Sequence, residues 1–206
     1  MPQCVPKPTR EEEIVTAALE HPLGPNTVAD WRAADHPDDG RRLELILGHF
    51  FMSPSPGGPH QFTTGAVYRV LWEAVAAADR KDLYVVLGVG VEISTPWRTA
   101  LIPDVAVLNV RPTETSFPPE ALVLAVEVWS PGNTRSERET KVAAYAAAGV
   151  EFLWIVEPGK AGLVQFRAYR LVNGSYREEA TGGMGDVLTS VPGPVPISID
   201  MAELTL

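Results

Sequence analysis

The chain has 206 residues, of which 45% are hydrophobic and 21% are charged, as in an ordinary globular protein with a sizeable core. Its one cysteine, Cys4, excludes an intrachain disulfide framework and argues against a zinc site. The net charge of −9 argues against a nucleic-acid binder that relies on lysine and arginine, although a divalent cation can offset clustered carboxylates. No segment reaches the roughly 20 apolar residues of a membrane span, and the first residues lack a signal-peptide pattern. We therefore expect a cytoplasmic protein without membrane contact.

The N-terminal half predicts helices, one β-hairpin and two strands. Residues 10–35 have the apolar spacing of two short helices, interrupted at Pro22, Gly24 and Pro25. Segments 43–47 and 50–52 are typical of paired strands around a tight turn at Gly48. An apolar stripe from 60 to 78 predicts a longer helix. The apolar segments 83–93 and 102–110 predict strands, the first interrupted by Gly88 and Gly90.

The C-terminal half contains the most apolar segment, 122–129, which predicts a central strand buried on both faces. A capping-box pattern at 136–139 predicts the start of a helix that ends at Gly149, and 152–156 predicts another buried strand. Asn173-Gly174 indicates a hairpin between segments 163–171 and 176–179. The Gly- and Pro-rich end predicts irregular structure with a short strand near Ile197.

This order of elements predicts an α/β (α+β) fold with a mixed central sheet flanked by helices. The step from strand 122–129 through a helix to strand 152–156 predicts one parallel crossover. We expect a single domain over residues 1–206, with a helical extension at 1–26 and an irregular tail at 182–206.

Two acidic residues on the predicted strands are candidate metal ligands. Glu127 interrupts an otherwise apolar strand, where an ionised carboxylate is costly unless it is paired or binds a metal. The alternative for Glu127 is a structural pair with an arginine. Asp104 follows Pro103 at a strand start, where simple turn chemistry is the alternative. Because two carboxylates on neighbouring strands can face each other, together they suit Mg²⁺ or Mn²⁺.

The helix after the Glu127 strand supplies a candidate cation. Lys141, Tyr145 and Ala148 share one face of that helix, which must cross back over the sheet. A lysine beside a metal site can stabilise developing negative charge. The alternative is a solvated helix lysine.

Several segments, in this order, resemble the PD-(D/E)XK nuclease superfamily, and most closely its bacterial restriction-endonuclease branch, formerly catalogued as a domain of unknown function. They are Asp38–Gly48, Met52-Ser53-Pro54 with His60, Pro103-Asp104, Glu127-Val128-Trp129-Ser130-Pro131, and Lys141–Val156. The resemblance covers roughly residues 27 to 180. One departure is that the superfamily's usual lysine position, two residues after the acid, is Trp129, and Lys141 on the next helix fits the place that this branch uses instead.

The resemblance implies a restriction-endonuclease-like fold and a metal-dependent endonuclease that hydrolyses phosphodiester bonds in DNA. Asp104 and Glu127 would ligate Mg²⁺ (or Mn²⁺), and Glu44 could add a further carboxylate to the metal. Lys141 would assist the attack of water. Glu44, His60 and Tyr145 form a second tier of site residues. The resemblance also implies a homodimer. Two alternatives stay open: a non-catalytic nucleic-acid or protein-binding module on the same fold, and a hydrolase of small phosphoesters.

Overall fold

The computed structural model describes residues 23–35, 37, 39–130, 132–159 and 163–205. In chain order its elements are α2 (Val28–Ala33), β1 (Arg42–Ile46), β2 (His49–Ser53), α3 (Gly58–Ala77), β3 (Tyr84–Leu87), β4 (Gly90–Ser94), β5 (Thr99–Leu101), β6 (Val105–Leu108), β7 (Ser116–Phe117), the 3₁₀ turn η1 (Pro119–Ala121), β8 (Leu122–Val128), α4 (Arg135–Ala147), β9 (Phe152–Pro158), β10 (Val164–Val172), β11 (Ser175–Gly182), β12 (Val187–Leu188), β13 (Ile199–Asp200) and the 3₁₀ turn η3 (Met201–Leu204).

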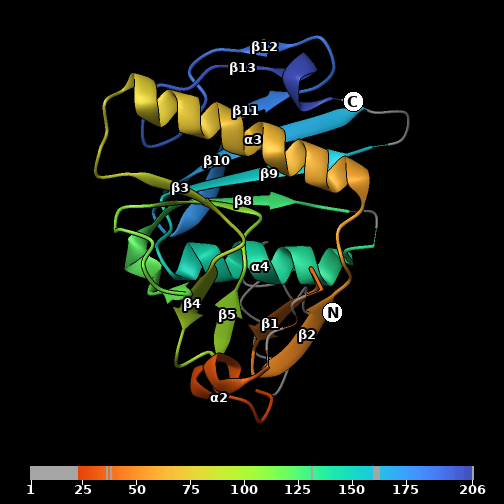
Figure 1. The fold of residues 1–206 in the computed structure, drawn as a ribbon, viewed down its shortest axis with the longest axis vertical. Helices are drawn as coiled ribbons and strands as arrows, with labels where there is room; N and C mark the ends of the chain where they lie inside the picture. Colours follow the sequence, from red (N-terminus) through yellow and green to blue (C-terminus); the bar gives the residue numbers. More distant parts are fainter. Residues whose placement is uncertain (1–22, 36, 38, 131, 160–162, 206) are drawn as a thin grey trace, which may run out of the picture.

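Two mixed sheets form the framework (Figure 1). The six-stranded sheet has the order β11-β10-β9-β8-β6-β3, and the five-stranded sheet has the order β2-β1-β5-β4-β7. Helix α3 covers one face of the six-stranded sheet, and α4 covers the other face, on the side of the five-stranded sheet (Figure 1). The predicted α+β architecture with a mixed central sheet and flanking helices is confirmed.

Strand β8 lies inside the six-stranded sheet, as its apolar sequence predicts. It pairs in parallel with β9, and α4 connects the two strands in the chain. Because side chains alternate along a strand, the two faces of β8 enter different cores. Val126 and Val128 pack in the core beneath α3, whereas Ala125 packs with residues of α4 and the five-stranded sheet. Glu127 shares the face of Ala125, so its carboxyl points toward α4.

Two predicted strands differ in the structure, since one is divided and the other is shorter than predicted. The segment 83–93 forms β3 in the six-stranded sheet and β4 in the five-stranded sheet, so the prediction of one strand is wrong. The chain changes sheet at Gly88, whose φ of +60 is in the left-handed region that favours glycine. Of the predicted strand 102–110, only Val105–Leu108 is extended, and β5 ends before it at Leu101.

The remaining local predictions are largely confirmed. The hairpins β1–β2 and β10–β11 form, and Asn173 and Gly174 adopt φ values of 51 and 79 at the second turn. Helix α4 ends before Gly149, but its N-cap is Thr134, which accepts a hydrogen bond from the Glu137 amide, and not Ser136. The predicted helical extension lies outside the described residues except for 23–26, which are not helical.

The tail after residue 182 has short strands and a 3₁₀ turn, and it packs its apolar side chains into the core beneath α3. The Thr63 hydroxyl of α3 also donates a hydrogen bond to the Leu204 carbonyl at 3.4 Å. Within the described residues, no helix has the length and apolar character needed to cross a membrane.

Candidate functional site

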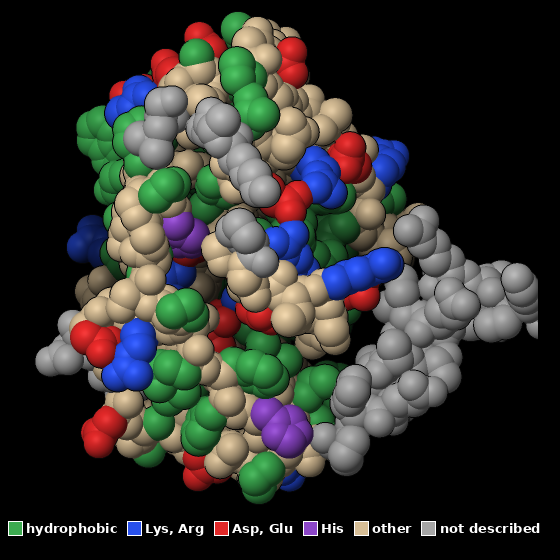
Figure 2. Space-filling view, turned by 90° about the vertical axis from the view of Figure 1, so that its right-hand side faces the viewer, with side chains coloured by type: hydrophobic (Ala, Val, Ile, Leu, Met, Phe, Trp, Pro, Cys, Tyr) green, Lys and Arg blue, Asp and Glu red, His purple; other side chains and the backbone are tan. Residues whose placement is uncertain are grey.

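Six residues predicted from the sequence converge at the end of the six-stranded sheet where β8 finishes. They come from both sheets and both long helices: Glu44 from β1, His60 from α3, Asp104 from the turn before β6, Glu127 from β8, and Lys141 and Tyr145 from α4. Figure 2 views this side of the molecule, and acidic and basic side chains gather in the middle of the face.

Glu127 is held from α4 by two hydrogen bonds. The Tyr145 hydroxyl donates to its Oε1 at 2.7 Å, and the Lys141 ammonium lies 3.3 Å from its Oε2. Burial raises the pKa of Glu127 to about 7; the charge of Lys141 opposes this shift, and the nearby carboxylates of Glu44 and Asp104 add to it. The positive charge that is present therefore does not fully compensate this carboxyl.

Lys141 and Tyr145 are one helical turn apart, so both side chains point from α4 toward the sheet. Both are buried, with Lys141 only 7% exposed. Although burial lowers the pKa of Lys141, the charges of Glu127 and Glu44 raise it overall, so the amine stays protonated. Burial and the charge of Glu127 raise the pKa of Tyr145, so its hydroxyl stays a donor.

Glu44 joins the five-stranded sheet to α4. Its Oε2 lies 2.8 Å from the Lys141 ammonium, and its Oε1 accepts a hydrogen bond from the Ile102 amide at 2.8 Å. The side chain is buried and faces the same side of β1 as that of Arg42, two residues earlier. Glu44 thus positions the lysine between two carboxylates.

Asp104 has a different set of partners. Its Oδ2 accepts a hydrogen bond from the Val128 amide at 2.6 Å, and its Oδ1 pairs with the Arg42 guanidinium and with His60 Nε2 at 3.3 Å. Burial would raise the pKa of Asp104, but the hydrogen bond from His60 and the charge of Arg42 lower it below its usual range. This carboxyl is therefore ionised.

Arg42 is the site residue that the sequence interpretation missed. It precedes Glu44 by two positions and lies just before the predicted strand 43–47, whereas β1 begins at Arg42, so the two side chains project from the same face of β1. Two arginines of α4, Arg135 and Arg138, have partners outside the site. Arg135 pairs with Glu139 on the surface, and Arg138 pairs with Glu157 and stacks over Trp129 at 4.8 Å.

The position two residues after Glu127 is occupied by Trp129, packed beneath Arg138. The lysine that contacts the Glu127 carboxylate comes instead from α4. The ammonium group of Lys141 thus reaches the carboxylate from the helix and not from the strand.

The donor chemistry of the site fits a divalent cation. Three buried carboxyls, Asp104, Glu127 and Glu44, face two cationic side chains, Lys141 and Arg42. Carboxylate oxygens are preferred ligands of Mg²⁺ and Mn²⁺, and a cation would offset the remaining negative charge. In the present arrangement Lys141 and Arg42 occupy carboxylate oxygens that a cation would need, and no three acidic, histidine or cysteine side chains of the described residues are grouped as a metal site.

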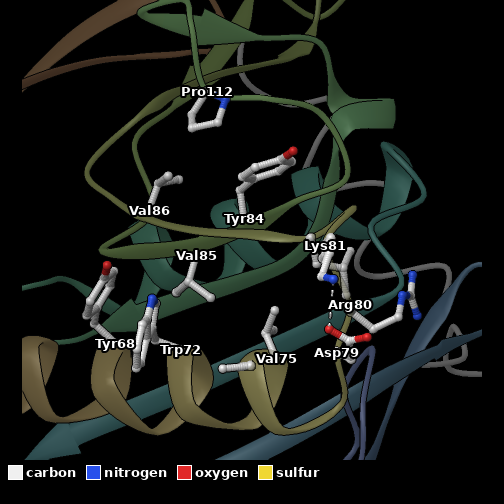
Figure 3. Close-up of a pocket in the computed structure, with 12 residues that line it drawn as sticks. Tyr68, Trp72, Val75, Asp79, Arg80, Lys81, Tyr84, Val85, Val86 and Pro112 are labelled. Atoms are coloured by element: carbon white, nitrogen blue, oxygen red, sulfur yellow. Dashed lines mark ion pairs between the residues drawn. The ribbon is translucent and has the colours of Figure 1, made fainter.

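A separate groove of about 430 Å³ lies between α3 and the edge strand β3 (Figure 3). Tyr68 and Trp72 project into it from α3, and Tyr84 and Val86 line it from β3. None of the converging acidic residues lines this groove, so it is distinct from the candidate site.

Comparisons with known proteins show the family and the fold. Residues 30–202 match the sequence profile of the Uma2 family, described as "Putative restriction endonuclease". A solved structure described as "a putative nuclease belonging to DUF820", from Anabaena variabilis, is similar with a TM-score of 0.62 and 17% identity, over 87% of this chain and 97% of that chain. At that identity the likeness shows the fold alone. A comparison with curated proteins finds no match. Because the Uma2 profile spans most of the chain, this protein belongs to the Uma2 family of restriction-endonuclease-like proteins.

Proposed function

We propose that this protein is a metal-dependent endonuclease that hydrolyses phosphodiester bonds in DNA. The observation that carries the proposal is the buried cluster in which Lys141 contacts Glu44 at 2.8 Å and Glu127 at 3.3 Å, with Asp104 one strand away. Membership of the Uma2 family, whose description is of a nuclease, supports the same activity.

Each residue has a role in this proposal. Asp104 and Glu127, with Glu44 as a further carboxylate, would hold Mg²⁺ or Mn²⁺. When bound, the cation would polarise the phosphoryl oxygens and offset the charge that develops on them. Lys141 stays protonated and is held by Glu44, so it can stabilise negative charge on the phosphate or orient the attacking water. Tyr145 fixes the orientation of Glu127, and His60 and Arg42 can turn from Asp104 toward a phosphate oxygen.

The test uses isosteric changes that preserve the shape of the site. Asp104→Asn and Glu127→Gln should each reduce Mg²⁺- or Mn²⁺-dependent cleavage of single-stranded and duplex DNA, whichever the wild type cleaves faster, by at least about 100-fold, as expected for the loss of a group that acts on the transition state. Glu139→Ala, which removes an exposed carboxylate from α4, is the matched control and should retain full activity. Equal cleavage by wild type and both site variants would refute the proposal.

A second candidate function is a non-catalytic binding module on the same fold. It is favoured by the pairing of each acid with a cation, because Lys141 and Arg42 could serve only to neutralise buried carboxyls. Calorimetry with Mg²⁺ and Mn²⁺ separates the two. Binding that disappears in Glu127→Gln supports the endonuclease, whereas no binding by wild-type protein supports the module.

Three expectations from the sequence accompany this proposal. We propose that residues 1–206 act as one domain, that two copies form a homodimer, and that the protein works in the cytoplasm. Sedimentation of the purified protein would test the homodimer directly.

A further inference from the structure

Strand β2 exposes apolar side chains beside the buried acidic cluster. It is the outer strand of the five-stranded sheet, next to β1, which carries Arg42 and Glu44. Phe50, Phe51 and Met52 are 40%, 45% and 47% exposed. Large apolar side chains exposed together on a strand are costly in water and often mark a binding surface.

The register of the hairpin places one of these side chains next to the site. Phe51 pairs with Glu44, and directly opposed residues of antiparallel strands project from the same face, with their Cβ atoms about 5 Å apart. Glu44 points toward Lys141, so the Phe51 ring lies on the site's side of the sheet. Phe50 pairs with Leu45, which packs in the opposite core with Trp31, so the Phe50 ring faces away.

The cations of the site are already engaged. Lys141 is paired with two carboxylates and Arg42 with Asp104, and the chain carries a net charge of −9. Phosphate attraction, which dominates the binding of duplex DNA, is therefore weak here. The carboxyls are also recessed, with Glu44, Asp104 and Glu127 only 2–4% exposed. An aromatic ring at the rim can bind an unpaired base by stacking, which requires no positive charge.

We propose that Phe51 is a stacking platform for an unpaired base beside the scissile phosphate, and that the substrate is single-stranded nucleic acid. This inference rests on the endonuclease activity proposed above. A nucleic-acid strand whose backbone lies over the acidic cluster would continue across β2, because Phe51 is the direct neighbour of Glu44. The base next to the cleaved bond then meets the Phe51 ring, and a duplex, whose bases are already paired and stacked, does not.

Cleavage kinetics of three proteins test the inference. Wild type, Phe51→Ala and Phe50→Ala are compared on a single strand, on the duplex of the same sequence, and on single strands with one abasic nucleotide at each successive position. Phe51→Ala should raise KM for the single strand by about 10-fold or more, since stacking on one aromatic ring contributes that much to binding. Phe50→Ala, with the same residue type and similar exposure on the opposite face, should stay within about 2-fold of wild type.

The abasic substrates report stacking itself. For the wild type, a substrate that is abasic at one particular position should have a KM raised by as much as Phe51→Ala raises it for the intact strand. For the Phe51→Ala variant, the same abasic substrate should show no further rise in KM. Phe51→Tyr should restore the wild-type KM. Equal effects of Phe50→Ala and Phe51→Ala, no effect of either, or faster cleavage of the duplex by wild type would overturn the inference while leaving the endonuclease intact. Cleavage of no nucleic acid by wild type would instead overturn the endonuclease proposal.

Discussion

At the scale of single residues, the site contains several buried ionisable groups that shift one another's pKa values. Asp104, with Arg42, His60 and an amide around it, is ionised, whereas the Glu127 carboxyl competes with two other acids for the charge of Lys141. Neighbouring carboxyls with opposite pKa shifts are a common feature of functional sites. The two pKa values shift in opposite directions because Asp104 contacts Arg42 and His60, whereas Glu127 shares Lys141 with Glu44.

Glu127 should make the metal-free protein less stable as pH rises. Its folded pKa of about 7 lies above the ordinary 4.5, so the native state retains this proton while the unfolded state loses it. The stabilisation is complete below pH 4.5 and is lost as pH rises through 7. In EDTA, the free energy of unfolding of wild type relative to Glu127→Gln should fall by on the order of 3 kcal/mol over this range. Urea denaturation at successive pH values measures the difference, and a flat difference would contradict the raised pKa.

Lys141 should be needed for stability as well as for the proposed chemistry. Lys141→Met leaves Glu44 and Glu127 buried without their shared cation, which should lower the free energy of unfolding by about 3–5 kcal/mol at neutral pH. Lys81→Met removes an exposed lysine and should change it by less than about 0.5 kcal/mol. Urea denaturation measures both variants. A loss below 1 kcal/mol for Lys141→Met would show that the lysine does not compensate the acids.

The sequence predicted these residues unequally, for physical reasons. Glu127 can be recognised by itself, because a charge within an apolar strand needs a partner. Asp104 occurs in an ordinary turn setting and is a candidate mainly because its predicted strand can lie beside that of Glu127. Lys141, Glu44 and His60 also occur in ordinary polar settings, and their grouping with the acids depends on the family resemblance. Arg42 was missed because it lies one residue outside the predicted strand 43–47, and its partner Asp104 is 62 residues away in the chain.

At the scale of elements, the first turn of α4 corrects a local prediction. Two hydroxyl residues, Thr134 and Ser136, are each followed three positions later by a glutamate, so the sequence permits two positions for the N-cap. The structure uses Thr134, two residues earlier than the predicted pattern at 136–139 would imply. The earlier start makes Ser136 the second residue of α4.

Removal of the observed cap should destabilise the protein, and removal of the predicted cap should not. Thr134→Ala loses the hydrogen bond from the Glu137 amide to the threonine hydroxyl, and should cost about 1 kcal/mol. Ser136→Ala should be neutral or slightly stabilising, since alanine favours a helix interior. Thermal unfolding of the two variants measures the contrast. The reverse order of the two melting temperatures would place the cap at Ser136.

Division of the segment 83–93 between two sheets shows a limit of local patterns. Both β3 and β4 have the composition of strands, so composition cannot say that they belong to different sheets. Gly88 marks the change through its left-handed backbone, but a glycine within a strand pattern equally suggests a bulge. The partner strands decide, since β3 pairs with β6 and β4 pairs with β5.

At the scale of the whole molecule, the site depends on both sheets being held around α4. Glu44 and Arg42 come from the five-stranded sheet, Asp104 and Glu127 belong to the six-stranded sheet, and Lys141 bridges them. Displacement of either sheet by 1 Å relative to α4 would break one of the contacts that Lys141 makes, at 2.8 Å with Glu44 and at 3.3 Å with Glu127. Stability of the cores on both faces of the six-stranded sheet therefore supports the site's geometry.

The C-terminal tail contributes to that stability despite its irregular sequence. Met201 is fully buried in the core beneath α3, together with Ile197, Ile199 and Leu204. Composition indicated irregular structure, because Gly and Pro are frequent between residues 182 and 196. Burial could not be predicted from that pattern, since the tail packs by single side chains and not by a regular face.

Met201→Ala should therefore lower the free energy of unfolding by about 2–5 kcal/mol, the cost of a cavity in a packed core. Met184→Ala, in the same tail at 60% exposure, is the matched control and should change it by less than about 0.5 kcal/mol. Urea denaturation followed by tryptophan fluorescence measures both, because Trp154 lies in the same core as Met201. If the two methionine variants unfold at the same urea concentration, the tail is not part of the core, and the packing beneath α3 that holds β8 and Glu127 in place must come from the helix alone.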